Sequence, residues 1–239
     1  MIGFKTFSLL SEEFDRRPGT QLGTNPGGRY THLVSGKDYY IKFPNNSEQA
    51  KVEVASSRVY NALGIPTLNP TGKDISGRIG VITPWRDDLK TVTEDELKSR
   101  IKTDPHFANE MVKLHVASAL VRNHDAVGLW DAPNIMFHKN GNGYSSIDQG
   151  GSMHFRAQGE PKEFGEDARE DLDSLRVQRR PSGQVFNLAY EHTTPEQHKA
   201  AKESLNSLTD EKIDAIINSV ALDPKYSDIL KKRRDSILK

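Results

Sequence analysis

The chain has 239 residues, enough for one large domain or two small ones, and either can bury a substantial apolar core. Lys and Arg together number 33, as do Asp and Glu, so the balanced charge disfavours a purely electrostatic nucleic-acid or membrane binder. Cysteine is absent, which excludes disulfides, a thiolate nucleophile and cysteine-ligated zinc.

The first residues, MIGFKTFSLLSEEF, contain a short apolar run. They lack the longer apolar region and the small-residue cleavage site of a signal peptide, and nothing in the sequence approaches the roughly 18 apolar residues of a membrane span. These features predict a cytoplasmic protein with no membrane span. An effector delivered into a host cell through another signal is the alternative.

Two strand-forming runs follow, GRYTHLV at 28–34 and DYYIKF at 38–43, and the glycine between them predicts a hairpin. Alternation in the second strand puts Ile41 and Phe43 on one face and Lys42 on the other. Lys42 is therefore directed away from the apolar face of its own strand.

A helix is predicted over SEQAKVEVASSRVYNALG, with Ser47 as the N-cap and Gly64 as the stop. The run GRIGVITPW then predicts another strand. The polar segment 86–100 predicts a connector, and we set the domain boundary there, with an N-lobe over residues 1–88 and a C-lobe over residues 89–239.

From Pro105 the pattern becomes helical, because Phe107, Met111 and Leu114 recur on one stripe. The segment NIMFHKNGNGYSSID predicts a hairpin around an Asn-Gly turn. An irregular segment follows Gly151, and two or three short helices are expected from Thr194. A strand-rich first part and a helical second part together predict an α+β, two-lobed fold.

The glycine-rich stretch GTNPGGRY, residues 23–30, is not a Walker A loop, because Arg29 and Tyr30 stand where Lys and Ser/Thr must bind phosphate and magnesium. It is not a dinucleotide fingerprint either, since it opens a strand and not a helix. A simple turn is the alternative. The order of a glycine loop, a strand with Lys42 and a helix with Glu53 is, however, the layout by which protein kinases hold ATP.

Taken together, GTNPGG, YYIKFP, EVASSRVYNALGIP, NHDAVGL and IDQGGSMHFRAQG resemble an atypical, HipA-like or phosphoinositide-kinase-like branch of the protein-kinase fold, found in small bacterial or phage kinases. The resemblance covers residues 23–173. It implies ATP and Mg2+ as cofactors and phosphoryl transfer to a hydroxyl, with protein Ser/Thr favoured over a lipid or inositol phosphate as the acceptor. No nucleic-acid partner is expected.

The resemblance also implies roles for individual residues. Asp125 faces the acceptor, and Asn134 and Asp148 bind magnesium. The residues expected around ATP are Gly23, Thr24, Asn25, Gly27, Gly28, Lys42, Glu53 and Ile82.

The sequence departs from common protein kinases in three ways. The interval from Asp125 to Asn134 is longer than in the H-R-D-L-x-x-x-N loop, so either this loop is enlarged or Asp131 takes part. Gln149 replaces the Phe of D-F-G, and no A-P-E follows, which argues against regulation by a conventional activation loop. A pseudokinase that serves as a binding module and a kinase fold adapted to nucleotidyl transfer are the competing hypotheses.

Overall fold

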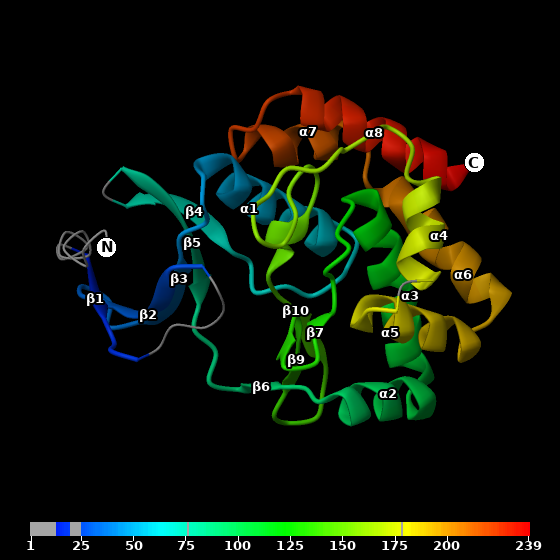
Figure 1. Ribbon diagram of the computed structural model, residues 1–239, viewed down its shortest axis with the longest axis horizontal. Coiled ribbons are helices and arrows are strands. Elements are labelled where there is room, and N and C mark those ends of the chain that lie inside the picture. The colour runs from blue at the N-terminus through cyan, green and yellow to red at the C-terminus, as the bar shows by residue number, and fades with distance from the viewer. Residues whose placement is uncertain (1–12, 20–24, 76, 178) are drawn as a thin grey trace.

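The computed structural model describes residues 13–19, 25–75, 77–177 and 179–239. A strand-rich lobe and a helical lobe lie side by side, with α1 (Ser47–Ala62) between them (Figure 1). The two-lobed α+β architecture predicted from the sequence is therefore present.

The strand-rich lobe is one antiparallel sheet with the order β1-β2-β3-β5-β4. Its strands are β1 (Phe14–Arg16), β2 (Gly27–His32), β3 (Asp38–Lys42), β4 (Thr71–Ile75) and β5 (Arg78–Pro84). The hairpin of β2 and β3 and the strand β5 agree with the sequence patterns. The short β1 and the polar, largely exposed β4 carried no strand pattern, and pairing with β2 and β5 defines them.

The N-cap of helix α1 lies one residue before the predicted one, because the side chain of Asn46, and not that of Ser47, accepts a hydrogen bond from the Gln49 amide (2.7 Å). Gly64 has a φ of +78°, the left-handed conformation that ends helices. Val54 packs against β5, whereas Tyr60 belongs to the core of the helical lobe. Helix α1 thus packs against both lobes.

The prediction of a polar connector over residues 86–100 is wrong. Residues 86–100 contain β6 (Leu89–Thr91) and the start of α2 (Glu94–Thr103), which opens with a capping box between Thr93 and Glu96. Leu97 and Ile101 are buried. The helix forms in this polar segment because these two apolar residues share one face and the capping box satisfies the first amides.

The helical lobe is organised around α3 (Pro105–Leu120), a predicted helix that is almost entirely buried. Strands β9 (Ile135–His138) and β10 (Tyr144–Ser146) form the expected hairpin, and β6 adds a third strand to it. Within the described residues, no helix has the length and apolar composition needed to cross a bilayer. The remaining helices are α4 (Arg169–Val177), α5 (Pro181–Glu191), α6 (Pro195–Glu203), α7 (Asp210–Asn218) and α8 (Lys225–Leu238).

A buried histidine makes this lobe sensitive to acid. The Nε2 atom of His115 lies 2.9 Å from the Leu172 carbonyl oxygen and Nδ1 lies 3.1 Å from the Tyr190 hydroxyl, so the neutral ring donates to the first and accepts from the second. Burial lowers the pKa of His115 from 6.5 to about 3. Between these values only the unfolded chain takes up the proton, so stability falls as the pH falls through this window, by up to about 1.4 kcal/mol per pH unit.

Urea unfolding measured between pH 7 and pH 4 tests this expectation. His115→Gln should flatten the pH dependence of the free energy of unfolding relative to the wild type. His106→Gln, at an exposed position of the same helix, should keep the wild-type slope. Equal slopes in all three proteins would contradict the role of His115.

Candidate active site

A buried ion cluster joins three elements at the junction of the lobes. Lys42, at the end of β3, has its Nζ 2.8 Å from Glu53 Oε1 on α1 and 2.7 Å from Asp148 Oδ1, just after β10. Lys42 is 8% exposed and Glu53 is 4% exposed, whereas the side chain of Asp148 keeps 48% of its surface accessible. One ammonium group is therefore shared by a buried and an accessible carboxylate.

The pKa values of the two carboxylates are shifted in opposite directions. Burial, reinforced by the charge of Asp148, raises the pKa of Glu53 to about 7, although Lys42 opposes the shift. For Asp148, partial desolvation of the carboxylate acts in the same direction, but the adjacent ammonium outweighs it and lowers the pKa. Burial alone would also lower the pKa of Lys42, yet the two carboxylates raise it. Lys42 stays protonated and Asp148 stays ionised, so Asp148 is the carboxylate suited to a cation.

The backbone after Asp148 is shaped by the cluster. Asp148 itself has a φ of +54°. A Cβ atom on Gly150 would lie 3.1 Å from Glu53 Oε2 and 3.3 Å from Asp148 Oδ1, so a side chain there would crowd both carboxylates. Gln149, which replaces the Phe of common kinases, is buried and donates to Ser146 Oγ (3.1 Å). A buried, hydrogen-bonded glutamine thus directly follows Asp148, the candidate metal ligand.

A second set of contacts holds Asp125. Its backbone amide donates to Asn123 Oδ1 (3.0 Å), and Asn134 Nδ2 donates to its carbonyl oxygen (2.8 Å). Asn134 Nδ2 also lies 3.4 Å from Asp125 Oδ2. Asn123 was not predicted from the sequence, although it directly precedes the His-Asp pair. The loop therefore brings Asp125 and Asn134 together despite their separation in the chain.

The long interval between these residues is a small hairpin. Strands β7 (Gly128–Leu129) and β8 (Ala132–Pro133) pair with each other, and the Asn134 amide donates to the Val127 carbonyl oxygen (2.8 Å), so the chain returns to its starting point. Gly128 has a φ of +78°, and a Cβ there would lie 2.5 Å from the Ala132 carbonyl oxygen. Only glycine permits this close return.

Asp131 and Asp125 have different surroundings. Asp131 is exposed in the turn of the hairpin, away from the backbone contacts that hold Asp125. Asp125 is partly buried, and burial together with the charge of Asp148 raises its pKa. A carboxylate with a raised pKa accepts a proton more readily near neutral pH, which suits Asp125 to proton transfer.

The residues fit a magnesium ion that is completed by phosphate oxygens. Asn134 uses its amide nitrogen on Asp125, which leaves its amide oxygen and the accessible carboxylate of Asp148 as hard oxygen donors. Among the described residues no group of three or more His, Cys, Asp or Glu side chains is arranged to hold a metal. Magnesium commonly combines one or two protein ligands with substrate phosphates, and this donor set matches that arrangement.

The glycine-rich stretch is only partly described. Gly23 and Thr24 lie outside the described residues, and Asn25 is in a bend before β2. A Cβ on Gly27 would lie 2.5 Å from the Ile41 carbonyl oxygen, so close packing of β2 on β3 already requires this glycine. Gly28 pairs with Ile41 in the same ladder.

Ile82, one of the residues expected around ATP, does not share a face of the sheet with Lys42. Ile82 pairs with Ile41, whereas Lys42 pairs with Val81. Because neighbouring residues of a strand point to opposite faces, Ile82 lies on the face opposite to Lys42, in a cluster with Tyr30 and Ile41. The residues that share the face of Lys42 at this end of the sheet are Tyr40, Val81 and Thr83.

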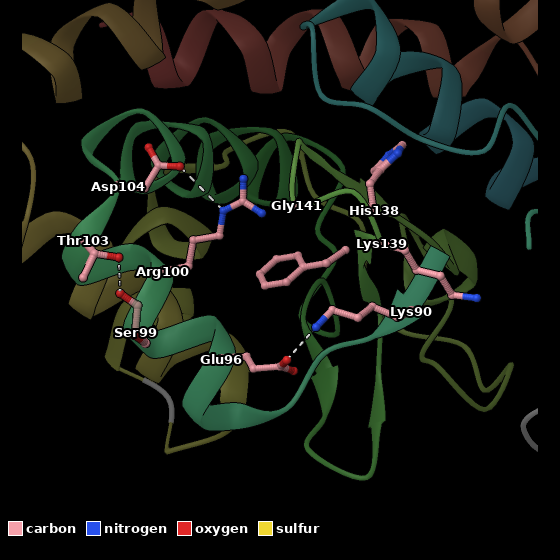
Figure 2. Close-up of a pocket in the computed structure, with 10 residues that line it drawn as sticks. Lys90, Glu96, Ser99, Arg100, Thr103, Asp104, His138, Lys139 and Gly141 are labelled. Carbon is pink, nitrogen blue, oxygen red and sulfur yellow. Dashed lines mark hydrogen bonds and ion pairs between the residues drawn. The ribbon is translucent and has the colours of Figure 1, made fainter. Parts of the chain in front are cut away.

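A separate pocket of about 500 Å³ lies between α2 and the β9–β10 hairpin (Figure 2). Four of its charged residues form ion pairs, with Lys90 Nζ 2.7 Å from Glu96 Oε1 and Arg100 Nε 3.6 Å from Asp104 Oδ2. Neither the ion cluster nor Asp125 lines it. This pocket is therefore distinct from the candidate active site.

Comparisons with known proteins agree with this geometry at the level of the fold. No model of a protein family matches the sequence, and no curated protein matches it. Among solved structures, the chain is similar to the Helicobacter pylori proinflammatory kinase CtkA, with a TM-score of 0.61 and 13% identity over 94% of this chain and 95% of that one. It is also similar to HipA of Shewanella oneidensis MR-1, solved with HipB and operator DNA, with a TM-score of 0.45 and 11% identity over 93% of this chain and 65% of that one.

The likeness to CtkA extends over almost the whole of both chains. The fold is therefore that of an atypical, two-lobed kinase, in agreement with the resemblance inferred from the motifs.

Proposed function

We propose that the protein transfers the γ-phosphoryl group of ATP to a hydroxyl group, with Ser or Thr of a protein as the favoured acceptor. A lipid or an inositol phosphate is the alternative acceptor. The observation that carries the proposal is the cluster in which Lys42 lies 2.8 Å from Glu53 and 2.7 Å from Asp148, with Asp125 near enough for the charge of Asp148 to raise its pKa. These contacts support the proposal because a cation suited to phosphate, a carboxylate suited to a metal and a carboxylate suited to a proton belong to neighbouring loops.

The adenine ring is proposed to lie on the face of the sheet that carries Lys42. Tyr40, Val81 and Thr83 share that face, and we propose them for the contact with ATP that the resemblance implied for Ile82. Lys42 would bind the phosphates, and the ion pair with Glu53 orients the ammonium group of Lys42.

Asp125 would accept the proton of the acceptor hydroxyl as the hydroxyl oxygen bonds to the γ-phosphorus. The bond from that phosphorus to the bridging oxygen of ADP breaks, and ADP leaves with the electron pair. Asn123 and Asn134 hold the backbone of Asp125 during this step. Magnesium held by Asn134 and Asp148 would neutralise charge on the β- and γ-phosphates.

The test is single-turnover transfer from γ-labelled ATP, with intact-mass analysis of the protein and of acceptor proteins. Asp125→Asn should slow transfer by about a hundredfold or more, because it removes the proton acceptor, and should leave ATP affinity nearly unchanged, because this group contacts the acceptor and not the nucleotide. Asp131→Asn, which removes an exposed carboxylate of the same loop, is the matched control and should transfer at the wild-type rate.

Other outcomes separate the competing functions. Addition of a nucleotidyl mass in place of a phosphoryl mass would indicate nucleotidyl transfer. ATP binding without turnover in the wild type would indicate a pseudokinase. Loss of transfer in Asp131→Asn with normal transfer in Asp125→Asn would show that the proton acceptor is in the hairpin.

A further inference from the structure

The side chain of Lys162 connects the two loops of the candidate active site. Its Nζ donates to the Arg122 carbonyl oxygen (2.5 Å) and to the Gly151 carbonyl oxygen (2.7 Å). Arg122 lies three residues before Asp125, and Gly151 lies three residues after Asp148. One ammonium group therefore spans the backbones of both loops.

The ammonium group of Lys162 forms its hydrogen bonds with backbone carbonyl oxygens. Among the residues that the structure describes, none of the ion pairs joins Lys162 to a carboxylate. Burial, followed by the charge of Arg122, lowers the pKa of Lys162 to about 7 although the charge of Asp171 opposes the shift, and Arg156 and Arg233 add further positive charge nearby. Burying an ammonium group near other positive charges costs free energy unless hydrogen bonds compensate for the lost solvation. Both the charged and the neutral amine carry enough hydrogens for the two carbonyls.

Backbone contacts reinforce the same junction. The Met153 amide donates to the Val121 carbonyl oxygen (2.6 Å), and the Lys162 amide donates to the His154 carbonyl oxygen (2.7 Å). Arg122 Nη1 donates to the Glu163 carbonyl oxygen (2.6 Å). Three chain segments thus meet here, and Lys162 is the side chain that joins the two leading to Asp125 and Asp148.

We propose that Lys162 is a positioning residue that fixes the loop of Asp125 relative to the loop of Asp148. This inference rests on the proposed phosphoryl transfer, in which the proton acceptor and the phosphate-bound metal must be held at a set separation. A displacement of about 1 Å between reacting groups can cost about a hundredfold in rate. Each loop also has local contacts of its own, so removal of Lys162 should alter their relative placement more than the binding of ATP.

Lys162→Met keeps the length of the side chain and removes its donors. We expect its kcat to fall tenfold to a hundredfold, roughly the cost of a small misplacement, while the Kd for magnesium-ATP changes less than about threefold. Lys162→Arg, which keeps donors and charge, should recover part of the lost kcat. Lys212→Met is the matched control, because Lys212 Nζ also donates to a backbone carbonyl, that of Ser207 (2.7 Å), but on α7. Its kcat should equal that of the wild type.

Hydrogen exchange gives a readout that needs no activity. Lys162→Met should exchange faster at residues 121–125 and 150–154 and normally elsewhere, whereas Lys212→Met should leave both segments unchanged. A wild type without phosphoryl transfer would remove the proposed function, and exchange would still test the connection. Unchanged exchange at either segment would overturn the inference. Equal losses of kcat and nucleotide affinity, with faster exchange throughout the lobe, would also overturn it. If Lys162→Met does not fold, Lys162→Arg should show the same changes in kcat and exchange at a smaller size.

Discussion

Replacing Asp148 by asparagine is expected to slow phosphoryl transfer by about a thousandfold or more, the equivalent of roughly 4 kcal/mol of transition-state stabilisation. The substitution keeps the shape of the side chain and removes its negative charge. A neutral amide binds magnesium weakly, so both cation affinity and turnover should fall. Lys42 keeps its partner Glu53, 2.8 Å away, so the ion pair between β3 and α1 should persist in the variant.

Calorimetry with ATP, at several magnesium concentrations, and single-turnover kinetics measure the two effects. The wild type should bind ATP more tightly with magnesium than without it, and Asp148→Asn should lose most of this difference. Asp131→Asn should behave as the wild type, and thermal unfolding of each variant shows whether the fold is retained. Equal ATP affinity in the wild type with and without magnesium would remove the proposed role of Asp148.

Replacing Arg233 by methionine is expected to lower the free energy of unfolding by about 3–5 kcal/mol. Arg233, on α8, has no exposed surface. Its guanidinium donates to the Ala119 and Leu120 carbonyl oxygens at the end of α3 (2.6 and 2.7 Å) and to Asp171 Oδ2 on α4 (2.6 Å). Its remaining bonds reach the carbonyl oxygens of Gly165 (2.7 Å) and Asp167 (3.2 Å). The substitution leaves several buried acceptors without this donor and weakens the compensation of a buried carboxylate.

Urea unfolding measures this loss. Lys232→Met is the matched control, because the neighbouring Lys232 forms a solvent-exposed ion pair with Glu166 (2.7 Å), and exposed pairs contribute about 1 kcal/mol or less. The double variant Arg233→Met/Asp171→Asn should lose less free energy of unfolding than the sum of the losses in the two single variants, since each substitution removes the same ion pair. A loss below about 1 kcal/mol in Arg233→Met would contradict the bracing role of this arginine.

Several elements were predictable because their signals are local. Alternation in β3, the helical stripe of α3 and the Asn-Gly turn between β9 and β10 depend only on residues close in the chain. The capping box of Thr93 and Glu96 is equally local, although the polar composition of the segment favours a connector over the helix α2 that forms there. The edge strand β4 had no such signal, since its side chains are polar and its strand character depends on pairing with β5.

The candidate site was only partly predictable. The order of Lys42, Glu53, Asp125, Asn134 and Asp148 along the chain was enough to suggest the site, because each residue belongs to a short motif. The exposed position of Asp131 was not predictable. Its separation from Asn134 in the sequence does not reveal the hairpin of β7 and β8 that places it in an exposed turn. Lys162 carried no motif at all.

The sequence by itself therefore determined the elements that have a periodic pattern and the chemical groups available for the proposed phosphoryl transfer. The tertiary structure decided which of these groups meet. The face of Ile82 depends on the register of β5 against β3, which a run that is apolar at successive positions does not specify. The contacts of Lys162 join segments on either side of the active site through folding of the intervening chain. Register and long-range contact are properties of pairs of segments, so no single stretch of sequence encodes them.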